Sequence, residues 1–135
     1  FLKNLKLHKI KFNKNYYASV KLEEPEKSFE IIKQMLTKNK KISAIICSTE
    51  FSALSAIKAC DFLNYKIGKD ISIITFDGAL VRDLSSPPIT AASFPVKELG
   101  KRAINILLSK KIKNQSTTFM PKSEIIERGS VHTVK

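Results

Sequence analysis

Apolar residues recur at helical spacing in three segments of the chain. The first, residues 25–38, begins with a proline and an acidic residue, and both suit the first turn of a helix. The second follows Ser48 and Thr49, either of which can cap a helix, and ends near Asn64, which tolerates the left-handed conformation. The third covers residues 96–109. These patterns predict three amphipathic helices.

Short apolar runs rich in β-branched or aromatic residues separate and flank these helices. They predict strands over residues 16–20, 42–47, 71–76, 89–92 and 119–127. Helices that alternate with buried strands indicate βαβ units, whose right-handed crossovers place helices over both faces of a parallel sheet. The predicted fold class is therefore α/β, with a three-layer open parallel sheet.

Two neighbouring predicted strands end in polar residues. The first runs into Thr49 and Glu50, and the next runs into Asp77 and Gly78. Polar ligands of an open parallel sheet bind at the carboxyl ends of its strands, so Thr49 and Asp77 are candidates for binding a sugar hydroxyl or a base edge. A second interpretation stays open, since Thr49 can equally cap a helix and Asp77 can close a turn with Gly78.

Length and charge limit the classes of function. With 135 residues, 43% of them hydrophobic, the chain has room for one globular domain, and it has no apolar run long enough to cross a membrane. Its net charge of +12 rests on 24 basic residues spread along the chain, of which only Arg82, Arg102 and Arg128 are arginines. Arginine is the residue that hydrogen-bonds guanine edges and binds phosphates with two parallel hydrogen bonds. Because arginine is scarce here, direct DNA binding by this segment is not expected.

The sequence carries no motif for catalysis or metal binding. It has no Gly-x-Ser-x-Gly elbow and no glycine-rich loop ahead of a helix, and His8 and His132 have no partners at metal-ligand spacing. Cys47 and Cys60 fall on apolar segments and are expected to be buried, reduced thiols, which fits a cytoplasmic protein. We therefore predict no enzymatic activity, no metal and no cofactor.

Several motifs along the chain resemble those of a known family. Residues 44–50 read AIICSTE, residues 70–77 read DISIITFD, residues 86–90 read SPPIT, and residues 95–103 have the form P-x-x-x-L-G-x-x-A. In this order they resemble the effector-binding domain of LacI/GalR-family transcriptional regulators. The resemblance implies a periplasmic-binding-protein-like fold with two lobes.

The resemblance also implies how the chain is divided. Residues 1–94 correspond to the C-terminal lobe, truncated at its start, and residues 95–113 to a crossover helix that belongs to the N-terminal lobe in the family. Residues 114–135 correspond to a return strand and tail. Because the first residue is Phe rather than Met, we expect the chain to be a fragment or a processed product. The resemblance implies that the DNA-binding headpiece and most of the N-terminal lobe are encoded upstream.

Family positions imply roles in binding a small effector of the sugar or nucleobase type. Asp77 matches an acidic residue that hydrogen-bonds the effector in several members. Thr49 stands where the family usually has asparagine, and Glu50 replaces an aspartate. Phe94 stands where some members have glutamine, and it either stacks on a sugar face or belongs to the core.

Dimerisation in the family uses the helix that corresponds to residues 50–63 and the loop after Asp77. The candidate contacts of a homodimer are Leu54, Ile57, Lys58, Leu80, Val81 and Leu84. For the three loop residues of this set, the alternative is a 3₁₀ turn that folds onto the sheet.

The expected function is the effector-binding and dimerisation segment of a cytoplasmic transcriptional regulator, in which a small ligand changes how an upstream helix-turn-helix binds operator DNA. The alternative is an extracytoplasmic sugar-binding protein of a transporter, whose lobes share the fold. Since half of the ligand clamp lies outside the chain in this interpretation, residues 1–135 alone are expected to bind effector weakly or not at all.

Overall fold

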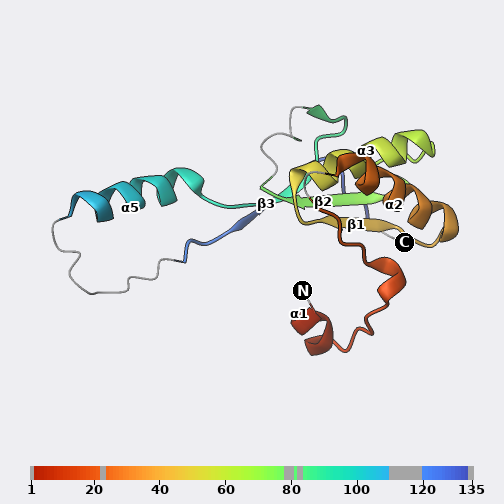
Figure 1. The fold of residues 1–135 in the computed structure, drawn as a ribbon, viewed down its shortest axis with the longest axis horizontal. Helices are drawn as coiled ribbons and strands as arrows, with labels where there is room; N and C mark the ends of the chain where they lie inside the picture. The colour runs from red at the N-terminus through yellow and green to blue at the C-terminus, as the bar shows by residue number, and fades with distance from the viewer. Residues whose placement is uncertain (1, 22–23, 78–80, 82–83, 110–119, 134–135) are drawn as a thin grey trace.

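The computed structural model describes residues 2–21, 24–77, 81, 84–109 and 120–133 and contains one mixed sheet (Figure 1). Its four strands are adjacent in chain order, and they are β1 (Ala44–Cys47), β2 (Ser72–Phe76), β3 (Thr90–Ser93) and β4 (Glu124–Ile126). Strands β1, β2 and β3 are parallel, whereas β4 is antiparallel to β3. The predicted α/β class is confirmed, with one antiparallel strand added to the expected parallel sheet.

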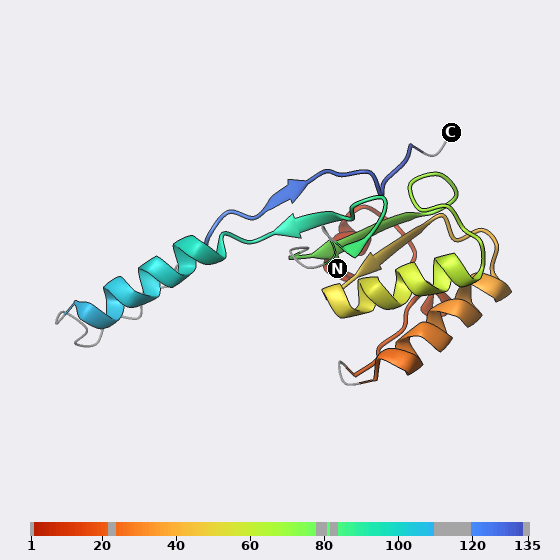
Figure 2. The same ribbon diagram turned by 90° about the horizontal axis from the view of Figure 1, so that it is seen from above.

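Helices α2 (Pro25–Lys38) and α3 (Glu50–Phe62) lie side by side on the same face of the sheet (Figure 2). Helix α3 packs on β1 and β2, and α2 packs against α3. The α3 face that meets the sheet carries Ala53 and Ala56, which are fully buried beside Ile73 of β2 and Leu36 of α2. Small side chains let helix and sheet approach closely. Among the described residues, the two helices that cover the sheet lie on this one face (Figure 2), whereas helices were expected over both faces.

Local rules account for the ends of these two helices. Helix α2 has the predicted bounds, with its proline in the first turn, Glu26 beside it and Lys38 in the last turn. These charges match the helix dipole. After α3, Asn64 has a φ of 60°, which confirms the left-handed residue predicted there.

The strand predicted over residues 16–20 is wrong. A short 3₁₀ helix, η1 (Lys14–Tyr16), occupies its start, and none of the described residues 2–21 lies in a strand. Tyr16 and Tyr17 are 53% and 59% exposed. Aromatic residues favour strands where they can pack on a half-buried surface, and these two rings have no such surface.

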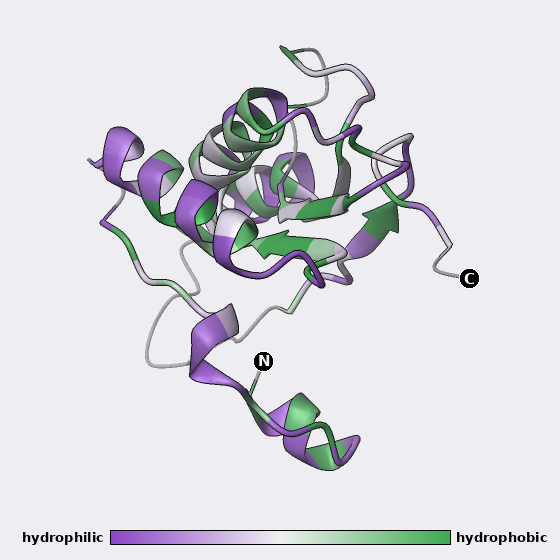
Figure 3. Ribbon diagram, turned by 90° about the vertical axis from the view of Figure 1, so that its right-hand side faces the viewer, coloured by the Kyte–Doolittle hydropathy of each residue, from purple (hydrophilic) through white to green (hydrophobic). Residues whose placement is uncertain are grey.

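Two helices lie outside the compact part of the structure (Figure 1). Helix α1 (Leu2–Leu7), which has no buried residue, stands apart from the sheet and contains both hydrophobic and hydrophilic residues (Figure 3). Helix α5 (Val96–Leu108) confirms the helix predicted at 96–109 and projects away from the sheet (Figure 1). Within the described range 84–109, no residue of α5 is buried. Its apolar stripe is therefore uncovered in this chain.

The segment after β4 crosses the loop that precedes β2. Gly68 in that loop has a φ of +78°, and a Cβ at this position would lie 2.2 Å from the carbonyl oxygen of Gly129. A Cβ at Gly129 would in turn lie 2.8 Å from Cβ of Pro87. The two backbones approach this closely because Gly68 has no side chain, and the missing side chain of Gly129 leaves room for Pro87.

We predict that Gly68→Ala lowers the free energy of unfolding by about 1–3 kcal/mol, because it introduces both left-handed strain and a backbone clash. The matched control is Gly100→Ala in α5, where an added Cβ meets nothing within 4 Å. This control should leave the stability unchanged or raise it by up to about 1 kcal/mol. Urea unfolding of both variants measures the difference, and equal stabilities would contradict the close approach.

Candidate functional site

Three predicted ligand-binding residues follow the carboxyl ends of the three parallel strands. Thr49 follows β1, Asp77 follows β2 and Phe94 follows β3. Strand β1 pairs with β2, and β2 pairs with β3, in parallel, so these ends share one edge of the sheet. The backbone N–H of Asp77 donates to the carbonyl of Ala92 in β3 at 2.9 Å. The adjacency of the β1 and β2 ends that the sequence predicts is therefore confirmed.

Thr49 caps helix α3. Its Oγ1 accepts a hydrogen bond from the backbone N–H of Ser52 at 3.2 Å, and Ser52 Oγ accepts from the backbone N–H of Thr49 at 3.2 Å. This reciprocal capping box satisfies two of the N–H groups at the start of the helix. The capping interpretation is confirmed, while contact between Thr49 and an effector stays a prediction.

Asp77 is an exposed residue at the turn that leaves β2. Its φ is +67°, in the left-handed region that aspartate tolerates better than most residues. The other half of the predicted turn, Gly78, lies outside the described residues. The turn places a carboxylate at the sheet edge in contact with solvent, where it can accept hydrogen bonds from a ligand.

Glu50 and Val81 connect helix α3 to the segment that follows Asp77. The half-buried carboxylate of Glu50 accepts a long hydrogen bond of 3.4 Å from the backbone N–H of Val81. Val81 has no exposed surface and belongs to the hydrophobic core. This burial agrees with the alternative in which the loop folds onto the body of the protein, and contact between Val81 and a partner subunit stays a prediction.

The other predicted dimer contacts differ in exposure. Leu54 and Ile57 are half-buried and pack against the core, whereas Lys58 is exposed and has its Nζ 5.2 Å from the centre of the Phe29 ring. Leu84 is 67% exposed, and Leu80 lies outside the described residues. An exposed position leaves Lys58 and Leu84 available to a partner.

The sequence did not reveal a cluster of cations and rings on the outer surface of α2 and α3. Phe29 and Phe62 make an edge-to-face pair with ring centres 5.9 Å apart, and Lys33 Nζ lies 5.0 Å and 5.2 Å from the two centres. The four-residue spacing of Phe29 and Lys33 on one helix is a signal of this cluster in the sequence. Phe62 joins it through the packing of the two helices.

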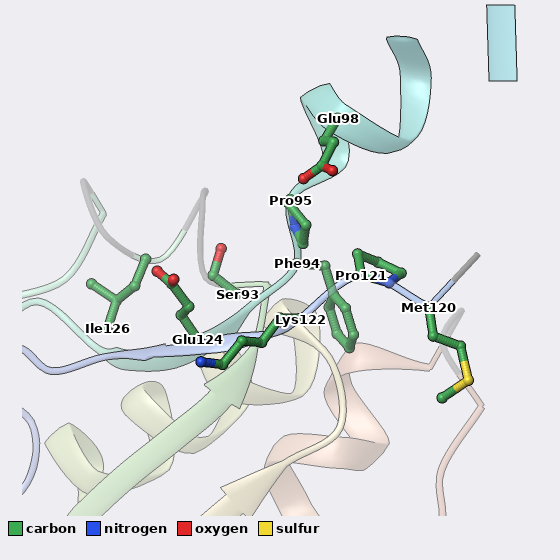
Figure 4. A pocket seen from close by; sticks show the side chains of 9 residues that line it. All are labelled: Ser93, Phe94, Pro95, Glu98, Met120, Pro121, Lys122, Glu124 and Ile126. Carbon is green, nitrogen blue, oxygen red and sulfur yellow. The ribbon is translucent and has the colours of Figure 1, made fainter. Parts of the chain in front are cut away.

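A pocket of about 420 Å³ lies where the chain leaves the sheet for α5 and returns (Figure 4). Its lining comprises Ser93, Phe94, Pro95, Glu98, Met120, Pro121, Lys122, Glu124 and Ile126. Phe94 is 40% exposed, so the interpretation that places it in the core is wrong. The ring forms one wall of a pocket that also offers carboxylates and an ammonium group. Sequence spacing does not predict the residues from the return segment, because their position depends on the pairing of β4 with β3.

Within the described ranges the structure has neither a metal-binding cluster nor a membrane helix. No three His, Cys, Asp or Glu residues there are grouped so that they could hold a metal ion. No helix among the same residues is long and apolar enough to span a bilayer. His132 instead lies with its Nδ1 3.0 Å from Oγ of Ser72.

The two cysteines are buried and protonated at neutral pH. Burial raises the pKa of Cys47 to about 11, an effect that a hydrogen bond with Ser52 partly offsets. Burial also raises the pKa of Cys60 to about 12, and the nearby charges of Asp61 and Cys47 add to the effect. Since the thiolate is the reactive form, neither side chain serves as a nucleophile here.

Comparison with known proteins places the chain in a family. A family model described as a periplasmic binding protein-like domain matches residues 1–131. The chain belongs to this family. Among curated relatives, the HTH-type transcriptional repressor PurR of Erwinia tasmaniensis is 31% identical over 112 residues, which cover 80% of this chain and 32% of that protein. The PurR of Yersinia enterocolitica is 33% identical over the same length.

Solved structures of LacI-type regulators share the fold of this periplasmic binding protein-like domain. A sugar-binding LacI-family regulator from Escherichia coli superposes with a TM-score of 0.79 at 23% identity, over 97% of this chain and 47% of that one. A PurR-family regulator from Vibrio parahaemolyticus gives 0.65 at 26% identity, over 79% and 39%. The expected relationship to the LacI/GalR effector-binding domain is confirmed, and the chain spans about a third of the length of its curated relatives.

The buried thiols predict a loss of stability at alkaline pH. A thiol ionises near pH 9.0 in the unfolded chain but only near pH 11 or 12 in the folded protein, so its stabilising effect is complete below pH 9 and is lost as pH rises through that window. Between pH 8 and about pH 10.5 each thiol should lower the free energy of unfolding by about 1–2 kcal/mol. Urea unfolding of the wild type and of the Cys47→Ala/Cys60→Ala variant measures this. An identical pH dependence of the two proteins would contradict it.

Proposed function

We propose that the chain is the effector-binding and dimerisation segment of a cytoplasmic LacI/GalR-type transcriptional regulator. Its ligand is a small molecule of the sugar or nucleobase type that binds at the sheet edge carrying Asp77, Thr49 and Phe94. The observation that supports this most strongly is the convergence of three parallel strand ends at one edge, next to an open pocket. The family relationship supports a role of that edge in binding a small ligand.

The side chains at this edge suit a neutral, hydroxyl-rich or heterocyclic ligand. A carboxylate such as Asp77 can accept hydrogen bonds from two neighbouring hydroxyls or from a ring N–H. The exposed ring of Phe94 offers a flat apolar surface on which a sugar face or a base can stack. Glu98 and Lys122, both lining the adjacent pocket, add an acceptor and a donor.

Related regulators bind ligands of this type. A LacI-family regulator from Arthrobacter has been solved with lactose, and the regulator CelR has been solved with cellobiose. Their identities to this chain are 22% and 13%, so they support a sugar-sized site without naming its ligand.

Regulation requires that the ligand favour one arrangement of two lobes. We assign residues 1–94 to one lobe, residues 95–113 to a helix of the other and residues 114–135 to the return, which accounts for the uncovered apolar stripe of α5. An effector that binds the closed arrangement more tightly shifts the population toward it. A homodimer that forms through α3 and Leu84 passes this change to operator-binding headpieces encoded outside these residues.

Two other functions have less support. A transporter-linked sugar-binding protein has the same fold, but the curated relatives matched here are transcriptional repressors. Enzymatic activity has no support among these relatives either.

We predict weak but localised effector binding by residues 1–135, because the site is half of a clamp. A ¹⁵N-labelled chain titrated with lactose, cellobiose, ribose, hypoxanthine and inorganic phosphate should respond to one of these probes at Asp77 and Phe94. Asp77→Asn should weaken that binding by about tenfold, since a hydrogen bond to a charged acceptor is lost. The control Asp61→Asn, an exposed carboxylate on α3, should leave it unchanged.

Three results would contradict the proposed site. These are the absence of a response to any probe, equal binding by the Asp77 and Asp61 variants, or sub-micromolar affinity of the isolated chain for a probe.

A further inference from the structure

The face of the sheet opposite α2 and α3 carries apolar side chains. On β2, Ile73 and Thr75 are buried, and Ile73 belongs to the core beneath α3. Because side chains alternate between the two faces of a strand, Ile74 and Phe76 point to the other face. Phe76 is 42% exposed there, which is much for a phenylalanine in a central strand.

The pairing of neighbouring strands extends this apolar face. Ile46 of β1 pairs with Ile74, and Ala92 of β3 pairs with Phe76. Ile125 of β4 in turn pairs with Ala92. Paired residues lie on the same face of a sheet, so these five residues form one surface, which we call the lower sheet face. Ile46 and Ile125 are 62% and 66% exposed.

The polar residues of the same face are covered. Ser72 shares the face of Ile74 by alternation, and Thr90 shares it by pairing with Ile74. Both are buried beneath the return segment, where Ser72 Oγ accepts from the N–H of His132 at 3.2 Å and Thr90 Oγ1 accepts from the N–H of Arg128 at 3.0 Å. The return segment therefore covers the beginning of this face, while its apolar remainder is the part that stays exposed.

Helix α1 has an apolar surface of matching size. Leu2 and Leu5 are three residues apart and share one side of the helix. The helix ends in a Schellman motif, in which Lys9 has a φ of 57°, its N–H donates to Lys6 at 3.1 Å, and the N–H of Ile10 donates to Leu5 at 2.8 Å. This motif turns Ile10 back toward Leu5. Leu2, Leu5 and Ile10 thus form one apolar surface, on which Leu2 and Ile10 are more than half exposed.

The position of α1 places these two surfaces on the same side of the sheet. In Figures 1 and 3, α2 and α3 lie above the strands and α1 lies below them. The hydroxyl of Tyr16 accepts from Nδ2 of Asn39 at 2.8 Å, which ties the segment after α1 to the end of α2, close to the start of β1. From this anchor, residues 9–15 can reach about 25 Å when extended. Three adjacent strands measure only about 10 Å across, so α1 can reach the lower sheet face.

We propose that α1 is a lid that closes on the lower sheet face, with Leu2, Leu5 and Ile10 packed on Ile74 and Phe76. Closure would bury both apolar surfaces and complete a third layer of the fold. The chain's own helix is favoured over a second copy, because α1 is tethered to the face and two chains of net charge +12 repel each other. The proposal is independent of the proposed function.

Disulfide trapping in the whole 135-residue chain tests where α1 docks. In a Cys47→Ala/Cys60→Ala background, Leu5→Cys is combined in turn with Ile46→Cys, Ile74→Cys and Ala92→Cys. At least one of these pairs should form an intrachain disulfide about tenfold faster than the same sheet cysteine combined with Leu7→Cys. Leu7 is the matched control, since it lies on the opposite side of α1 from Leu5. Equal rates for the two sets, or disulfides formed mainly between chains, would overturn the proposal.

Binding of the neutral dye Nile red tests whether the lid covers the apolar face without engineered cysteines. Leu5→Gln should raise the dye fluorescence about threefold over the wild type, because the lid no longer covers the face. Leu7→Gln should leave the fluorescence unchanged, and the two substitutions have the same small effect on helix propensity. A wild type that already binds as much dye as Leu5→Gln would show an open face and contradict the lid. A wild type that excludes the dye but is a dimer by light scattering, with Leu5→Gln unchanged, would assign the face to a second copy.

Discussion

The arrangement of the sheet depends on the buried hydroxyl of Ser130. This hydroxyl donates to the carbonyl of Ile73 in β2 at 2.6 Å and accepts from the backbone N–H of Thr90 in β3 at 2.8 Å. The backbone carbonyl of Ser130 also accepts from the N–H of Ile73 at 3.0 Å. A buried backbone group without a hydrogen-bond partner lowers the stability of the fold. The segment after β4 supplies these partners to the backbone where β2 and β3 begin. By fixing these two strands relative to each other, it fixes which residues meet at their opposite ends.

The candidate site follows from that fixed register. Asp77 and Phe94 come directly after β2 and β3, and the β3-to-α5 connection carries Phe94 into the wall of a pocket. The return segment supplies the opposite side of this pocket, including Lys122. Residues far apart in the sequence therefore form one surface because β4 returns antiparallel to β3. A ligand bound at this surface would contact both connections to α5.

Local physical rules made much of this structure predictable. The proline and charges of α2, the Thr49 cap and the left-handed Asn64 are short-range effects that the sequence displays directly. The features that the sequence did not predict are long-range ones: the lack of strand pairing over residues 16–20 and the pocket residues of the return segment. Each feature depends on which segments pack together in the folded protein. Such packing is set by the sheet as a whole and not by residues that are close in the sequence.

The free energy of unfolding of Ser130→Ala tests the dependence on this hydroxyl most directly. The substitution leaves the N–H of Thr90 buried and without its acceptor. We expect a loss of about 1–3 kcal/mol relative to Ser123→Ala, which alters an exposed serine of the same return segment. Equal stabilities of the two variants would contradict the claim that this hydroxyl holds β2 and β3 in register.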